Sequence, residues 1–125
     1  MRPRTGERAI ESLASARRAF EACAEKKAYD LRLLDVSGLT IVADYFVICT
    51  AGSDVNARAI ADEVRRALKE HERTPIGVEG REDGWWVLID YGDIVVHVFR
   101  EEARQYYAIE QTWSDARVIE TSEAA

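Results

Sequence analysis

Cysteine and proline are both scarce in this chain of 125 residues, which has two of each. Cys23 and Cys49 lie far apart and form no CxxC pair, so the sequence predicts neither a zinc site nor a thiol redox motif. No apolar run approaches the roughly 18–20 residues of a membrane-spanning helix, and the first ten residues lack the apolar stretch of a secretory signal. These absences favour a cytoplasmic protein that has no membrane segment.

The sequence motifs of common enzymes are also missing. There is no P-loop and no GxGxxG. Gly52-Ser53, at a predicted strand-to-helix turn, is typical of nucleotidyltransferases, but the Asp-x-Asp pair that holds Mg²⁺ on one strand face does not follow it. We therefore interpret Ser53 as a helix cap and His97, in an apolar strand, as structural. The sequence predicts no catalytic residue, cofactor or metal, and favours a binding protein over an enzyme.

Charge is divided unevenly along the chain. Residues 1–28 contain seven basic and four acidic residues, whereas residues 29–125 contain ten basic and nineteen acidic residues, a net charge of −9. A body this acidic repels phosphate backbones, so we do not expect it to bind nucleic acid directly. A basic protein partner is favoured, and a role of the acids in solubility alone is the alternative.

The segment 85–99 is the most informative part of the chain. Two apolar runs flank Tyr91-Gly92, which predicts a tight β-hairpin with these two residues in its turn. Large aromatic rings and acids gather in or just before it: Trp85, Trp86, Tyr91, Phe99, Glu79, Glu82, Asp83, Asp90 and Asp93. Aromatic side chains with few lysines are typical of protein-binding surfaces.

Alternation along the first hairpin strand divides its side chains between two faces. Trp86, Leu88 and Asp90 share one face, and Trp85 and Tyr91 lie on the other with two aliphatic residues. Both faces are apolar, so periodicity alone does not indicate which of them is buried. Outside the hairpin, Asp44 precedes an apolar run and is predicted to cap the preceding turn, with contact to a partner as the alternative.

The order of the predicted elements indicates one α/β domain. Helices are predicted over residues 7–27, after Ser53 with an apolar stripe over 57–68, and over 102–113; strands are predicted over 31–36, 45–50, 76–79 and in the hairpin. The second strand is apolar on both faces and therefore central, and a parallel crossover is expected to follow it. We expect a mixed sheet of about five strands flanked by helices, formed by residues 7–115, with flexible ends at 1–6 and 116–125.

Taken together, these segments resemble the ribosomal silencing factor family, also called the Iojap family. The resemblance spans roughly residues 8–116, and its most specific part is an Asp-Tyr-Gly-Asp turn at 90–93 followed by Val-His-Val-Phe at 96–99. Further matching pieces lie at 33–36, 44–48, 78–80, 86–89 and 104–113. The resemblance implies a fold similar to that of nucleotidyltransferases without the catalytic carboxylates.

The resemblance also implies a function and a set of contact residues. Members of the family bind the large ribosomal subunit at the protein numbered fourteen, block its association with the small subunit and repress translation. Carried onto this chain, the expected partner-binding residues are Trp86, Leu88, Asp90 and Tyr91, with Glu79 and Asp44 as further candidates. A ribosome-assembly factor acting on immature large subunits, or a nucleotide-binding enzyme using Gly52-Ser53, are the alternatives. The sequence allows a monomer or a homodimer.

Overall fold

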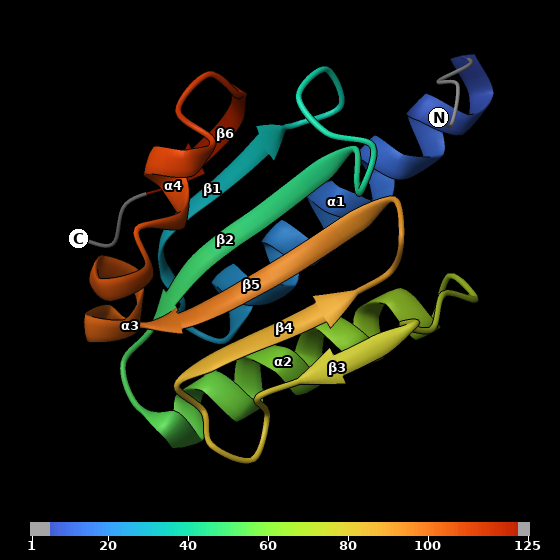
Figure 1. Ribbon diagram of the computed structural model, residues 1–125. Coiled ribbons are helices and arrows are strands. Elements are labelled where there is room, and N and C mark those ends of the chain that lie inside the picture. Colours follow the sequence, from blue (N-terminus) through green and yellow to red (C-terminus); the bar gives the residue numbers. More distant parts are fainter. Residues whose placement is uncertain (1–5, 123–125) are drawn as a thin grey trace.

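Six strands form one mixed sheet in the order β3-β4-β5-β2-β1-β6 (Figure 1). The computed structural model describes residues 6–122. Its strands are β1 (Tyr29–Asp35), β2 (Tyr45–Ala51), β3 (Gly77–Glu79), β4 (Trp86–Asp90), β5 (Ile94–Arg100) and β6 (Arg117–Ser122). Its helices are α1 (Gly6–Glu25), α2 (Asp54–Lys69), α3 (Glu101–Tyr107) and α4 (Ile109–Thr112). The α/β class and the mixed sheet predicted from the sequence are confirmed, with six strands where about five were expected.

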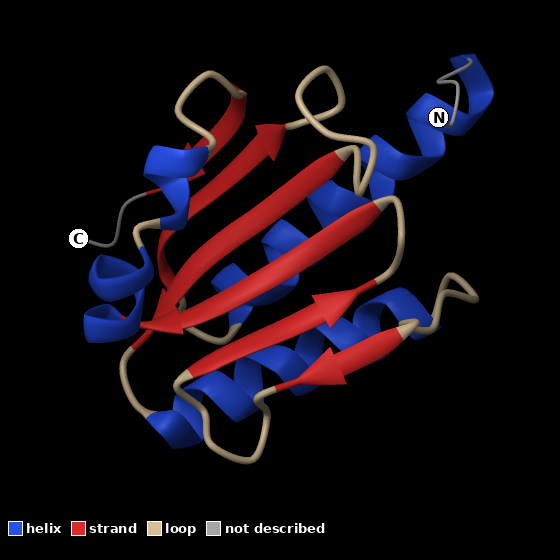
Figure 2. Ribbon diagram, in the orientation of Figure 1, coloured by secondary structure: helices blue, strands red, loops and turns tan. Residues whose placement is uncertain are grey.

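Helices α1 and α2 cover one face of the sheet, behind the strands in Figure 2. Each presents an apolar stripe: α2 buries Ala57, Ile60, Ala61, Val64 and Leu68, and α1 buries a set of small side chains that includes Ala16, Ala19 and Cys23. The Ser53 side chain accepts a hydrogen bond from the Asn56 backbone N–H at 3.0 Å and so caps the start of α2, as predicted. Burial of these stripes against the sheet forms the main core.

Strand β2 lies inside the sheet and is buried along its whole length, as its apolar sequence predicts. It pairs in parallel with β5 and antiparallel with β1. The crossover through α2 connects β2 to β3, but β5 and β4 lie between these two strands. The parallel neighbour of β2 is therefore the second strand of the hairpin, and β3 is an edge strand.

The predicted helix over 102–113 is wrong in one respect, because it is broken into α3 and α4. Ala108 lies between them in the left-handed conformation, with φ of 48°. The guanidinium of Arg104 binds both carboxylate oxygens of Glu110 at 2.8 Å across this break and also donates to Thr50 Oγ1 at 2.7 Å. These contacts fix the two short helices at one end of the sheet.

The second correction concerns the C-terminal segment. We predicted a flexible tail from residue 116 onward, but β6 (Arg117–Ser122) pairs antiparallel with β1 and forms an edge of the sheet. The strand-forming signal in this segment, Val118 and Ile119, is too short to stand out from sequence alone. Residues 1–5 and 123–125, to which the sequence analysis assigned flexible ends, lie outside the described residues, and Gly6 begins α1.

Across residues 6–122, no helix combines the length and the apolar character that a membrane crossing requires.

Candidate partner-binding surface

Strand β4 divides its side chains between the two faces of the sheet. Val87 and Ile89 are fully buried beneath the helices, whereas Trp86, Leu88 and Asp90 are half-buried on the opposite face. This is the face on which α3 and α4 lie at one end, leaving β3, β4 and much of β5 without a covering helix in Figure 2. The grouping of these three residues on one face is confirmed, and we call this region the open face.

Trp86 is fixed within a group of rings at the end of β4. Its ring stacks on Phe99 with centroids 4.9 Å apart and lies 4.6 Å from the ring of Tyr107 in α3. The indole Nε1–H donates to His97 Nδ1 at 3.2 Å. Trp86 therefore has a set orientation while part of its surface still faces solvent. Its neighbour Trp85, just before β4, is 38% exposed.

His97 lies beneath this group of rings and is a neutral side chain. Burial lowers its pKa to about 4, because the charged form is poorly solvated there. Since Nδ1 accepts from Trp86, the proton of the neutral ring is on Nε2, which has no hydrogen-bond partner among the described residues. The role of His97 in holding Trp86 agrees with the structural interpretation made from the sequence.

A row of side chains crosses the open face next to Trp86. Leu88 lies opposite His97 on β5 and opposite Glu79 on β3, so the three side chains share this face. Glu79 is exposed at the end of the edge strand. The structure thus brings Glu79, Leu88 and Trp86 together, as a combination of one acid and two apolar groups.

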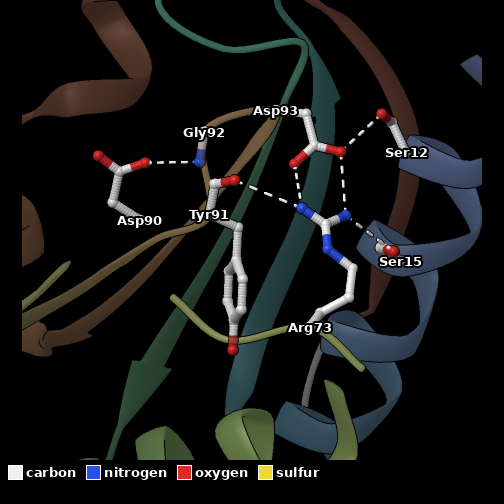
Figure 3. Close-up of polar contacts among 7 residues, drawn as sticks. All are labelled: Ser12, Ser15, Arg73, Asp90, Tyr91, Gly92 and Asp93. Atoms are coloured by element: carbon white, nitrogen blue, oxygen red, sulfur yellow. Dashed lines mark hydrogen bonds and ion pairs between the residues drawn. The ribbon is translucent and has the colours of Figure 1, made fainter. Parts of the chain in front are cut away.

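Asp90 is a turn residue as well as a member of the open face. Its Oδ1 accepts a hydrogen bond from the Gly92 N–H at 2.8 Å (Figure 3). Tyr91 N–H donates to the Ile94 carbonyl at 2.9 Å, so the two loop residues are Gly92 and Asp93, one position later than predicted. Gly92 has φ of 91°, which glycine adopts at little cost.

Two of the expected contact residues are buried. Tyr91 is 5% exposed and packs in the helix-covered core, where burial raises the pKa of its hydroxyl to about 12. Asp44 is 8% exposed; its N–H donates to the Asp93 carbonyl at 2.8 Å and its carbonyl accepts from Val36. Tyr91 is therefore not the surface anchor that we expected, and Asp44 contacts the hairpin turn through its backbone. Both support the turn from within.

A polar cluster that no pattern in the sequence predicts holds the other side of this turn (Figure 3). Arg73 donates to both carboxylate oxygens of Asp93, at 3.0 and 2.5 Å, and to the Tyr91 carbonyl at 3.3 Å. Ser12 of α1 donates to Asp93 at 2.6 Å, and Ser15 accepts from Arg73 at 3.1 Å. These residues come from three separate segments, and no local pattern connects them.

The aromatic surface also extends further than the sequence indicated. Tyr107, 44% exposed, packs on Trp86, and Tyr106, 78% exposed, lies edge-on to Tyr107 with ring centroids 5.0 Å apart. An unbroken helix over 102–113 would place Tyr106 on the same side as Ile109 and Trp113. The break at Ala108 separates them, and only Ile109 and Trp113 pack on the sheet.

The Gly52-Ser53 turn, which suggested a nucleotide-binding enzyme, forms hydrogen bonds within the chain. Gly52 N–H donates to Asn56 Oδ1 at 2.9 Å, and Ser53 caps α2. Within the part of the chain that the structure describes, no group of three or more histidine, cysteine or acidic side chains is placed to hold a metal ion. The arrangement offers an aromatic and acidic surface for contact with another molecule.

Comparisons with known proteins give a consistent result. Residues 9–125 match the family model described as "Ribosomal silencing factor during starvation". The ribosomal silencing factor of Bacillus subtilis is 44% identical over 98 residues, which cover 78% of this chain and 83% of that protein. The factor of Halalkalibacterium halodurans is 40% identical over 102 residues, 82% of this chain and 87% of that protein.

Two crystal structures share the fold. A protein from Chromobacterium violaceum superimposes with a TM-score of 0.80 at 36% identity, covering 90% of this chain and 92% of that chain. A protein from Bacillus halodurans gives a TM-score of 0.77 at 35% identity, covering 86% of this chain and 98% of that chain.

Proposed function

Because this chain belongs to the ribosomal silencing factor family, we propose that it binds the large ribosomal subunit in the cytoplasm and represses translation. The support for this general function is that its relatives are named ribosomal silencing factors. The finer proposal is that the open face binds the ribosomal protein numbered fourteen and thereby blocks association with the small subunit. The protein acts in this proposal as a steric block, and no catalytic step is involved.

The single observation that carries the finer proposal, binding through the open face, is the composition of that face. Trp86 and Leu88 are half-buried there, Tyr107 extends the aromatic surface, and Glu79 lies exposed beside Leu88. Aromatic anchors surrounded by polar groups are the usual energetic centre of a protein–protein interface. Residues 29–125 carry a net charge of −9, which complements a basic ribosomal protein and speeds encounter with it.

Each expected contact residue has a defined place in this proposal. Trp86, Leu88 and Glu79 contact the partner directly, and Asp90 contacts it while also closing the turn. Tyr91 and Asp44 act indirectly, since both are buried and support the hairpin turn. The nucleotide-binding alternative has no comparable support, because Gly52 and Ser53 bond within the chain.

Co-sedimentation with purified ribosomal particles tests the proposal. We expect the protein to sediment with free large subunits, to be absent from small subunits, and to shift joined ribosomes towards separate subunits. Sedimentation with small subunits alone, or an unchanged fraction of joined ribosomes at saturating protein, would contradict it. Sedimentation with immature large subunits but not with mature ones would favour the assembly role instead.

A further inference from the structure

A pocket of about 600 Å³ lies at the end of the helix-covered side of the sheet. It is formed by α1, the segment that follows α2, and the hairpin turn, and its polar lining includes Ser12, Ser15, Arg18, His71, Arg73 and Asp93. Pockets that bind small molecules usually measure roughly 300–1,000 Å³. The volume therefore suits a small ligand, and the pocket is separate from the open face on the opposite side of the sheet.

The carboxylate of Asp93 and the two terminal nitrogens of Arg73 in the pocket already form hydrogen bonds within the chain. Asp93 receives hydrogen bonds from Arg73 at 3.0 and 2.5 Å and from Ser12 at 2.6 Å. The two terminal nitrogens of Arg73 donate hydrogen bonds to Asp93, to Ser15 and to the Tyr91 carbonyl. This pair is electrically balanced and rigid, so it forms a fixed wall of the pocket.

Three other donors in the pocket remain available. The Ser15 oxygen accepts from Arg73 at 3.1 Å, which leaves the hydroxyl hydrogen without an acceptor among the described residues. A hydroxyl that accepts from a guanidinium becomes a better donor, because successive hydrogen bonds polarise one another. Arg18, half-buried on α1, and His71, exposed after α2, form no ion pair within residues 9–122.

We propose that this pocket binds a small molecule through one oxyanion, a phosphate or a carboxylate, held by Arg18, His71 and Ser15. Guanidinium and hydroxyl donors suit both anions, and the contact with Arg18 is the strong one because it is charge-assisted. Glu11 also lines the pocket and repels negative charge, so a ligand with one anionic group fits better than a ligand with two. The exposed side chain of Ile10 at the rim meets the uncharged part of the ligand.

A nuclear magnetic resonance titration of the whole 14.1 kDa chain tests this proposal. Inorganic phosphate and acetate are the two probes, added at constant ionic strength with chloride as the balancing ion. We expect saturable shifts of the backbone amide signals of Ser15, Arg18 and His71 with one probe or both, and the tighter probe identifies the preferred anion. Linear, unsaturated shifts with both probes would overturn the proposal.

Two neighbouring arginines provide a matched pair of variants. Arg18→Gln removes the charge from the pocket, whereas Arg17→Gln removes the same charge from the side chain that pairs with Glu120 of β6. We expect Arg18→Gln to raise the dissociation constant of the preferred probe at least tenfold and Arg17→Gln to leave it within twofold, with both variants folded by their amide spectra. Equal losses in the two variants, or no loss in Arg18→Gln, would contradict a site in this pocket.

Discussion

At the residue scale, Asp90 and Asp93 show how differently two aspartates of one turn are used. Asp90 is half-buried and accepts a single backbone hydrogen bond from Gly92. Burial alone would raise the pKa of Asp93, but hydrogen bonds from Arg73 and Ser12, together with the guanidinium charge, outweigh it and hold that pKa below its ordinary value. Asp93 is therefore ionised in the folded protein at neutral pH and stays ionised to a lower pH than an ordinary aspartate.

This environment predicts a pH-dependent contribution of Asp93 to stability. Because its folded pKa lies below the unfolded value of 3.8, the contribution is complete above pH 3.8 and is lost as the pH falls through the folded pKa. We expect Asp93→Asn to lower the free energy of unfolding by about 1–3 kcal/mol at pH 7, with the difference from wild type shrinking below pH 4. Urea denaturation across this range measures it. Asp83→Asn, at an exposed aspartate, is the control and should follow wild type.

His97 predicts a second pH effect in a different window. Its pKa is about 4 in the folded protein against 6.5 unfolded, so stability is complete above pH 6.5 and falls as the unfolded chain gains a proton between pH 6.5 and 4. The full effect is roughly 3 kcal/mol at about 1.4 kcal/mol per pH unit. His97→Phe should flatten this dependence, even though the lost bond to Trp86 lowers stability at pH 7. If the free energy of unfolding changed with pH in the same way for the variant and the wild type, the pKa of His97 would not be lowered in the folded protein.

Trp86 predicts the largest single effect on partner binding. Trp86→Ala should weaken association with the large subunit by about 2 kcal/mol or more, as expected for an aromatic centre of an interface. It should also lower the melting temperature, because the ring packs on Phe99 and Tyr107. Trp85→Ala provides the comparison on the opposite face of the strand. A binding loss in Trp85→Ala with none in Trp86→Ala would move the interface to the other side of β4.

At the scale of elements, the break between α3 and α4 shows where local sequence preference is overridden. Alanine is the strongest helix former, and residues 101–112 carry no glycine or proline to interrupt a helix. The bidentate contact between Arg104 and Glu110 and the bond from Arg104 to Thr50 are tertiary contacts. They hold Ala108 in a conformation that its sequence does not favour.

This break predicts a stabilising substitution. Ala108 has φ of 48°, which costs an L-residue roughly 1–2 kcal/mol relative to a right-handed conformation, whereas glycine adopts it freely. We expect Ala108→Gly to raise the free energy of unfolding by up to about 1 kcal/mol, measured by chemical denaturation. Ala59→Gly, within α2, should act in the opposite direction because glycine weakens a helix interior. A loss of stability in both variants would contradict the strain at Ala108.

At the scale of the whole molecule, the sequence predicts those parts of the fold that are encoded locally. Apolar periodicity gave α1, α2, the central position of β2 and the hairpin. It missed β6, whose place depends on pairing with the distant β1. It also missed the contact of Arg73 with Asp93 and Ser12, and the inward orientation of Tyr91, because both faces of the hairpin are apolar. These features depend on which segments meet in space.

The charge of the whole molecule predicts how association responds to salt. Attraction between the acidic body and a basic partner should raise the association rate at low ionic strength, and screening over about 8–10 Å should reduce it near physiological salt. Glu79→Gln, on the open face, should lower the rate and flatten its salt dependence in stopped-flow measurements. Glu25→Gln, at the end of α1, is an equal charge change away from that face. Identical salt slopes for the two variants would remove Glu79 from the interface.

Strand β6 has a consequence for the folding kinetics of the chain. Leu31 of β1 pairs with Ser122, so this edge of the sheet closes only when two distant segments of the chain meet. Contacts between such distant segments form slowly, because the entropy of closing the loop between them must be overcome first. Until then, the backbone of β1 is an unpaired edge to which another chain can add. Refolding at high protein concentration should therefore compete with aggregation through β1, and the late pairing of β6 ends that exposure.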